Sequence, residues 1–102
     1  ANNIEEILSV EGVDGFIIGP YDLSGSMGIP GEFNHKNLLS VLDDVYKVAS
    51  RLKKPGGIHI VEPDRLQLQS KIDDGHKFIA YSVDIRMLDT CARNGINEIR
   101  VK

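Results

Sequence analysis

The sequence predicts an α/β fold in which three parallel strands alternate with helices. Several stretches place apolar residues at helical spacing, and each alternates with a short β-rich run bounded by glycine or proline. The run Phe16-Ile17-Ile18 is apolar on both faces of the pleat, which is typical of parallel strands covered on both sides. Strands that alternate with helices in this way form parallel sheets with right-handed crossovers.

The first half of the chain contains two predicted helices, one strand and a long loop. A short helix follows Asn2 or Asn3 and ends at Gly12, and a strand covers residues 13–18. Residues 21–35 are rich in glycine, serine and proline, so we expect a loop there with room for one short helical turn. The strongest helix signal is the apolar stripe over residues 38–52, with Asn34 or His35 as its cap.

The second half repeats the strand and helix pattern twice. The predicted elements are a strand over residues 58–61, a helix from Asp64 to Ile72 with Pro63 in its first turn, a strand over residues 77–82, and a helix capped by Asp84 and stopped by Gly95. The βα units are unevenly spaced, which argues against a superhelical repeat protein.

Length and composition limit the class of protein. The chain has 102 residues and a net charge of −3 with scattered basic residues, which argues against nucleic-acid binding. Apolar runs are far shorter than a membrane span requires. Cys91 is the only cysteine, so there is no internal disulfide, and we expect a buried thiol in a reducing compartment, the cytoplasm. The start at Ala1 is neither an initiator methionine nor a signal peptide, so we expect a piece of a longer protein.

The turn after the first strand is the main candidate site. Ligands of α/β proteins bind at the carboxyl ends of strands, and Gly19-Pro20-Tyr21-Asp22 stands at such an end. The carboxylate of Asp22 suits a hard divalent cation, and the backbone N–H groups of Tyr21 and Asp22 suit an anionic group of a substrate. The alternative is that Asp22 or Ser24 caps a helical turn.

Residues 11–28, with the sequence EGVDGFIIGPYDLSGSMG, closely resemble the HpcH/HpaI aldolases, which are metal-dependent class II pyruvate aldolases. The match continues at His35, Gly57, Pro63-Asp64 and Val83-Asp84, so the resemblance covers nearly the whole chain. It implies a (β/α)₈ TIM barrel of which residues 1–102 form one partial domain, the last three βα units.

The resemblance also implies a reaction. Asp22 would coordinate Mg²⁺, Mn²⁺ or Co²⁺, the amides of Tyr21 and Asp22 would receive the substrate carboxylate, and a 2-keto-4-hydroxy acid would be cleaved to pyruvate and an aldehyde. The second metal-ligating Glu, the substrate-binding Arg and the catalytic His of the family precede Ala1. The catalytic residues are therefore unknown for this chain.

Two further residues fall at pocket positions of the family. His59 stands where relatives place an apolar lining residue, so it either contacts substrate or is a packed, hydrogen-bonded core histidine. Val83 would shape the pocket. His76 is expected at the surface, and Glu62 as a solvated charge at a helix start. Relatives are often hexamers, so we expect a homo-oligomer in which Met87, Leu88, Cys91 and Ala92 pack against another chain.

Two alternative functions stay open at this point. A small, non-catalytic α/β module that binds an anion would also account for the turn at Asp22. The third possibility is a lyase acting on CoA esters, from the same superfamily.

Overall fold

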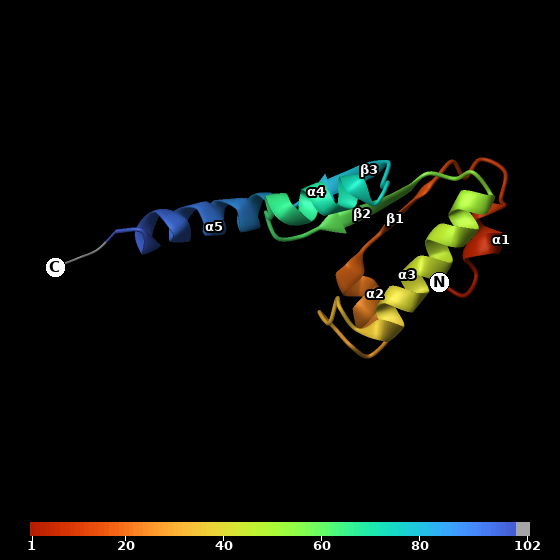
Figure 1. Cartoon of the computed structure of the whole chain (residues 1–102), viewed down its shortest axis with the longest axis horizontal. Helices are drawn as coiled ribbons and strands as arrows, with labels where there is room; N and C mark the ends of the chain where they lie inside the picture. Colours follow the sequence, from red (N-terminus) through yellow and green to blue (C-terminus); the bar gives the residue numbers. More distant parts are fainter. Residues whose placement is uncertain (100–102) are drawn as a thin grey trace.

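The computed structural model describes residues 1–99 and contains a three-stranded parallel sheet with helices packed along it (Figure 1). The helices are α1 (Ile4–Leu8), α2 (Pro20–Ser26), α3 (Lys36–Arg51), α4 (Arg65–Asp73) and α5 (Asp84–Asn97). The strands are β1 (Phe16–Ile18), β2 (Gly56–Ile60) and β3 (Phe78–Tyr81). The predicted α/β class and the alternation of strands with helices are confirmed.

The strands lie in the order β1-β2-β3, and both pairs are parallel. Ile18 is level with Ile58 in the first pair, and Ile58 is level with Ile79 in the second. All three strands therefore end at the same edge of the sheet, which places the segments that follow them side by side.

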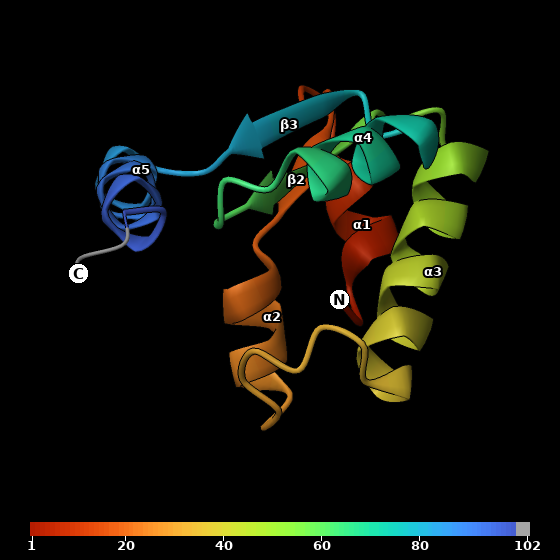
Figure 2. The same ribbon diagram turned by 60° about the vertical axis from the view of Figure 1, so that its left-hand side comes forward.

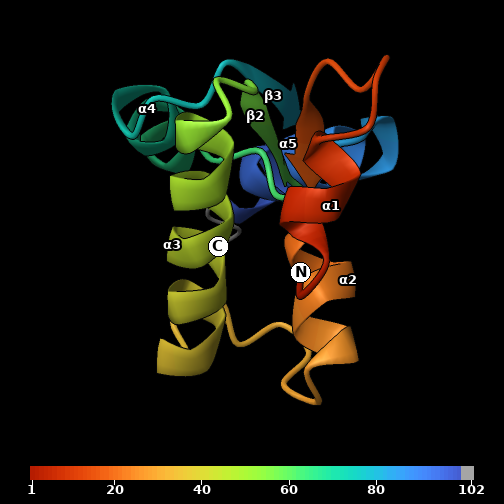
Figure 3. The same cartoon turned by 90° about the vertical axis from the view of Figure 1, so that its right-hand side faces the viewer.

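Helices α3 and α4 cover one face of this sheet, and α1 packs on α3 (Figure 3). The core lies under these helices: Leu8 of α1 is fully buried, and Val45 of α3 and Ile58 and Ile60 of β2 are almost so. The helix α3 is amphipathic as predicted, and its cap is His35, whose Nδ1 accepts a hydrogen bond from the N–H of Asn37 at 3.1 Å.

The opposite face of the sheet is open in the described residues. Because side chains alternate along a strand, Ile17, His59 and Phe78 lie on the face away from Ile58. Ile17 is 50% exposed and Phe78 is 44% exposed. The helices of residues 1–99 therefore cover one of the two faces that the apolar run of β1 predicts to be covered.

Strand β2 begins at Gly56, two residues before the predicted start. A Cβ at Gly56 would lie 2.6 Å from the Phe16 ring, and one at Gly57 would lie 2.4 Å from the Phe78 ring. The absence of side chains at these two glycines lets aromatic side chains lie directly on the strand.

The predicted loop over residues 21–35 contains most of a helix, α2, where the sequence predicts room for one short helical turn. Pro20 occupies its first position, where a proline needs no N–H partner. The helix ends near Gly28, which has a φ of +75°. Composition favoured a loop, but a proline that starts a helix and a glycine that ends it outweigh the glycine and serine content between them.

Helix α5 extends away from the sheet, so the molecule measures 62 × 27 × 22 Å (Figures 1 and 2). It continues through Gly95 to Asn97, because Gly95 does not take the left-handed conformation that stops a helix. Its N-cap is Val83, so the prediction that Asp84 is the cap is wrong. Cys91 is exposed on this helix, which corrects the expected buried thiol.

A hydrogen-bonded pair joins α3 to the segment after α4. The ring of His76 lies 2.7 Å from the hydroxyl of Tyr46 through Nε2, and its Nδ1 lies 2.9 Å from the carbonyl of Lys71. Since that carbonyl only accepts, Nδ1–H donates to it and the Tyr46 O–H donates to Nε2. The half-buried His76 is thus not the surface residue predicted. Burial, and to a lesser degree the charge of Asp74, raise the pKa of Tyr46 to about 12.

This pKa predicts a loss of stability at alkaline pH. A tyrosine of the unfolded chain ionises near pH 10, so between about pH 10 and pH 12 the unfolded state releases the proton and the folded state retains it. The free energy of unfolding should therefore fall across this window as pH rises. Urea denaturation at each pH should show that Tyr46→Phe lowers stability at pH 7 and removes this part of the decline. An identical slope in the variant would contradict the assignment.

Candidate functional site

The site is built where the parallel strands end. Gly19 follows β1, Glu62 follows β2 by two residues, and Ser82 follows β3. The common direction of the strands brings these three points to one edge of the sheet, as the sequence predicts.

The turn after β1 presents two backbone donors. Gly19 is extended, and its carbonyl accepts the first helical hydrogen bond of α2 from Leu23 at 2.9 Å. The N–H groups of Tyr21 and Asp22 precede that bond, so they have no partner within the helix and point out of its amino-terminal end. Pro20 has no N–H, which leaves these two amides as the donors of the turn.

The carboxylate of Asp22 folds back over Gly19. A Cβ at position 19 would lie only 3.0 Å from Oδ2 of Asp22. The carboxylate therefore occupies space that is free because Gly19 has no side chain. Gly19 is extended and continues the alternation of β1, which places this space on the same face as Ile17. Asp22 is exposed, and its carboxylate therefore lies on the open face of the sheet at the carboxyl edge.

His59 lies on the same open face, one strand away. The register that aligns Ile18 with Ile58 makes Gly19 level with His59. The Nε2 of His59 is 3.0 Å from the carbonyl oxygen of Ser82, so the half-buried imidazole reaches across β3 to the residue that follows it. This bond fits the expectation of a hydrogen-bonded histidine.

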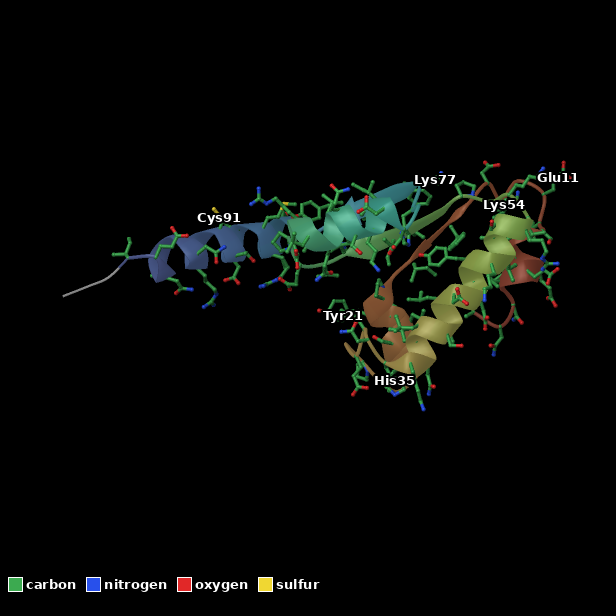
Figure 4. All side chains as sticks on the ribbon, in the orientation of Figure 1. Glu11, Tyr21, His35, Lys54, Lys77 and Cys91 are labelled. Carbon is green, nitrogen blue, oxygen red and sulfur yellow. The ribbon has the colours of Figure 1, made fainter. Side chains whose placement is uncertain are left out.

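Tyr21 and Val83 differ in what they offer the site. The ring of Tyr21 packs edge-to-face on Phe33 with 4.8 Å between ring centroids, and its backbone amide is the group that the turn presents. Val83 is extended at the start of α5 and 37% exposed, near the carboxyl edge. Figure 4 shows that Cys91 lies on α5, well away from Tyr21 and from the site.

Sequence reasoning missed two features of this edge. Ser82 has a φ of +60°, which no pattern in the sequence signals. Glu62, expected as a solvated charge, is paired with Arg86 of α5: the guanidinium donates to its carboxylate at 2.9, 3.0 and 3.3 Å. Arg86 also donates to Asp89, and hydrogen bonds from Arg93 and from Arg86 hold the pKa of Asp89 below its ordinary value. Partners 24 residues apart leave no local signal.

The described residues offer one carboxylate for a metal rather than a complete set of ligands. Residues 1–99 contain no group of three or more His, Cys, Asp or Glu placed to hold an ion. Asp22 over the open space at Gly19 fits Mg²⁺ or a similar ion, which often takes one or two carboxylates with waters and substrate oxygens as its other ligands. Within the same residues no helix is long and apolar enough to cross a membrane.

Comparison with known proteins gives consistent matches. A family model described as HpcH/HpaI aldolase/citrate lyase matches residues 1–90. The hydroxypyruvate/pyruvate aldolase of Sagittula stellata is 40% identical over 89 residues, which are 87% of this chain and 34% of that protein. The 2-keto-3-deoxy-L-rhamnonate aldolase of Escherichia coli is 36% identical over 83 residues, 81% of this chain and 30% of that protein. The chain thus spans about a third of the length of these relatives.

Solved structures match over nearly the whole chain. An HpcH/HpaI aldolase/citrate lyase family protein from Burkholderia cenocepacia has a TM-score of 0.88 at 25% identity and covers 98% of this chain and 38% of its own. An HpcH/HpaI aldolase from Desulfitobacterium hafniense has a TM-score of 0.85 at 29% identity and covers 97% and 39%. The predicted portion of a TIM barrel is confirmed by these similarities.

Ser24 is the buried anchor of the turn that carries Asp22, and this generates a prediction. Its fully buried hydroxyl accepts from the N–H of Gly31 at 3.0 Å and donates to the carbonyl of Tyr21 at 3.1 Å. Ser24→Ala leaves the Gly31 donor unpaired and should lower the free energy of unfolding by about 1–3 kcal/mol.

The matched control is Ser26→Ala, which removes an exposed hydroxyl two residues along the same helix. It should change the free energy of unfolding by less than about 0.5 kcal/mol. Urea denaturation of both variants checks the difference, and equal losses would contradict the anchoring role of Ser24.

Proposed function

Because the chain belongs to the HpcH/HpaI aldolase/citrate lyase family, we propose that the protein containing it is a carbon–carbon lyase. The proposed reaction cleaves a 2-keto-4-hydroxy acid to pyruvate and an aldehyde, and residues 1–102 form part of one barrel domain. The observation that carries the proposal is the turn at Gly19, where one carboxylate and two free backbone amides meet at the carboxyl edge of a parallel sheet.

The backbone of the turn binds and orients the substrate. The N–H groups of Tyr21 and Asp22 donate to the carboxylate of the keto acid, and the positive end of α2 favours that negative charge. Rigid backbone donors hold the keto acid in one orientation, with its carbon chain directed across the open face toward β2. His59 and Val83 then line the pocket, and Val83 contributes its shape.

Asp22 holds the divalent ion, which is Mg²⁺, Mn²⁺ or Co²⁺. When bound, the ion supplies a Lewis acid for the negative charge that develops as the carbon–carbon bond breaks. The cleavage also requires removal of the proton from the 4-hydroxyl group. We assign that proton acceptor and the remaining ligands of the ion to residues outside this chain, since residues 1–99 supply one carboxylate at the turn.

The exposed face of α5 supports a homo-oligomer. The stripe predicted to pack against another chain is exposed: Met87 is 41% and Leu88 is 73% exposed, and Cys91 and Ala92 are exposed as well. Exposed apolar residues on one helix are typical of a protein interface, and an interface between identical copies is the commonest kind. We propose that α5 packs against a second copy of the protein. The single, unpaired Cys91 supports the cytoplasm as its compartment.

A non-catalytic module that binds an anion is the second candidate. It is favoured by the two amide donors at the turn, which suit an anionic group by themselves. The two candidates differ in their need for a metal, because backbone amides bind a carboxylate with or without a divalent ion.

Removal of the Asp22 carboxylate tests the lyase. In the full-length protein, Asp22→Asn should reduce metal-dependent release of pyruvate from a 2-keto-4-hydroxy acid by about 100-fold or more, because a direct ligand should matter at least as much as the outer-shell groups that cost 10–100-fold. A coupled assay for pyruvate measures it. The control is Asp14→Asn, an exposed aspartate before β1, which should retain the wild-type rate. Unchanged turnover in excess chelator would refute the metal-dependent lyase, and metal-independent binding of pyruvate without turnover would favour the module.

A charge on the apolar face of α5 tests the assembly. Leu88→Asp should dissociate the oligomer, because it buries an unpaired carboxylate in the proposed interface. The matched control is Leu66→Asp on α4, where the leucine is even more exposed, at 83%, but lies outside α5. Light scattering of the full-length proteins measures the mass. Dissociation by both variants, or by neither, would contradict the role of α5.

A further inference from the structure

A cavity lies between α3 and α4, on the covered face of the sheet. Its volume is about 530 Å³, and ligand pockets typically have about 300–1,000 Å³. Its lining includes Gly56, where β2 begins, and Lys77, directly before β3. Figure 4 shows Lys54 and Lys77 well away from Tyr21. The cavity is therefore at the amino edge of the sheet, opposite the turn at Asp22.

One wall of the cavity is an apolar stripe of α3. Its members recur at the spacing of one helix face and line the cavity: Leu39, Leu42 and Tyr46. The stripe runs beside the core face of the same helix, which buries Leu38 and Val45. Leu39 is 49% exposed, so residues 1–99 leave this end of the stripe uncovered. The cavity thus offers an apolar surface that the core of this chain does not use.

Hydrogen bonds hold the aromatic ring of this wall in place. The ring of Tyr46 lies edge-on to that of His76, with 4.9 Å between centroids, and its hydroxyl is 2.7 Å from Nε2 of His76. Nδ1 of His76 is 2.9 Å from the carbonyl of Lys71. These bonds fix the ring relative to the backbone of Lys71. An aromatic ring held in this way favours a second aromatic ring packed against it.

The cavity is also lined by cations. Lys71 and Lys77 line it, and neither forms an ion pair within the part of the chain that the structure describes. Lys71 lies in the last turn of α4, where a cation is favourable by itself, but Lys77 lies outside any helix. A third lysine, Lys54, donates to the carbonyl of Val13. Two ammonium groups are therefore available to an anion.

The acidic groups of the lining do not cancel this charge. Asp43 and Asp74 both line the cavity. Asp43 is paired with Lys47 on α3, at 2.6 Å between the ammonium nitrogen and a carboxylate oxygen. This leaves Asp74 as the one lining carboxylate against Lys71 and Lys77 in the described residues. The cavity combines an apolar wall with an excess of positive charge.

We propose that this cavity binds an aromatic carboxylate, with its ring against the stripe of α3 and its carboxylate between Lys71 and Lys77. The stripe alone accepts any apolar molecule, and the lysines alone accept any anion. Their combination in one cavity selects a ligand that has both parts, because charge-assisted hydrogen bonds add to the burial of the ring. The site uses no residue of the turn at Asp22, so it is separate from the proposed lyase reaction.

Two ligands with the same ring and opposite charge test the proposal. Indole-3-acetate carries a carboxylate on its indole ring, and tryptamine carries an ammonium group. Calorimetry on the full-length protein should show that indole-3-acetate binds about tenfold more tightly, because hydrogen bonds to charged groups are the strong ones. Saturating pyruvate should leave this affinity unchanged, since the two ligands occupy opposite edges of the sheet.

Variants locate the binding. Lys77→Met removes the ammonium group and keeps an apolar chain, so it should remove most of the preference, and Lys71→Met should act in the same direction. The matched control is Lys36→Met, an exposed lysine at the start of α3 outside the cavity, which should bind as the wild type does. Ser50→Trp, at an exposed position of the lining, should fill the cavity and abolish binding of both ligands. Circular dichroism checks that each variant is folded.

Proton NMR gives a readout of position. The ring current of bound indole-3-acetate should shift the signals of His76, beside the cavity, and leave those of His59 on the other face unchanged. Equal affinity for the two ligands, no binding of indole-3-acetate, an equal loss of the preference in Lys36→Met, competition by pyruvate, or shifts at His59 in place of His76 would each overturn the proposal. Failure of the lyase is a different result, seen as lack of pyruvate release.

Discussion

Parallel pairing of β2 with both of its neighbours is the constraint on which the candidate site depends. It makes β1, β2 and β3 end at one edge, and it sets Gly19, His59 and the residue after β3 within reach of each other. Aromatic rings lie directly against the backbone of β2. This close approach requires that Gly56 and Gly57 carry no side chain. A side chain at either position would push Phe16, Tyr46 or Phe78 away and disturb the register that aligns the site.

Much of the fold could be predicted from the sequence because local patterns determine it. The stripe of α3, a cap at Asn34 or His35 and the parallel direction of the strands follow from periodicity and from the alternation of elements. The position of Asp22 was predictable for the same reason, since a turn after a buried strand has one place in a parallel sheet. Short segments were less predictable. The composition around α2 is typical of a loop, and the helix depends instead on the backbone conformations of the proline at its start and the glycine near its end.

The contacts that complete the site could not be predicted. Ser82 takes a left-handed conformation because its neighbours hold it, and nothing local in the sequence requires that. Glu62 and Arg86 meet because the segments after β2 and β3 lie at the same edge of the sheet. His59 could be assigned to a strand, but its partner depended on the register between β2 and β3. Each of these contacts joins residues far apart in the sequence, so no local pattern predicts it.

The outer edges of β1 and β3 affect how the chain folds. In the described residues β1 and β3 each pair on one side only, so each presents a row of unpaired backbone donors and acceptors. The exposed Ile17 and Phe78 lie beside those rows. Unpaired strand edges of this kind are templates for pairing with another chain. In a folding intermediate that leaves them unpaired, such pairing leads to aggregation.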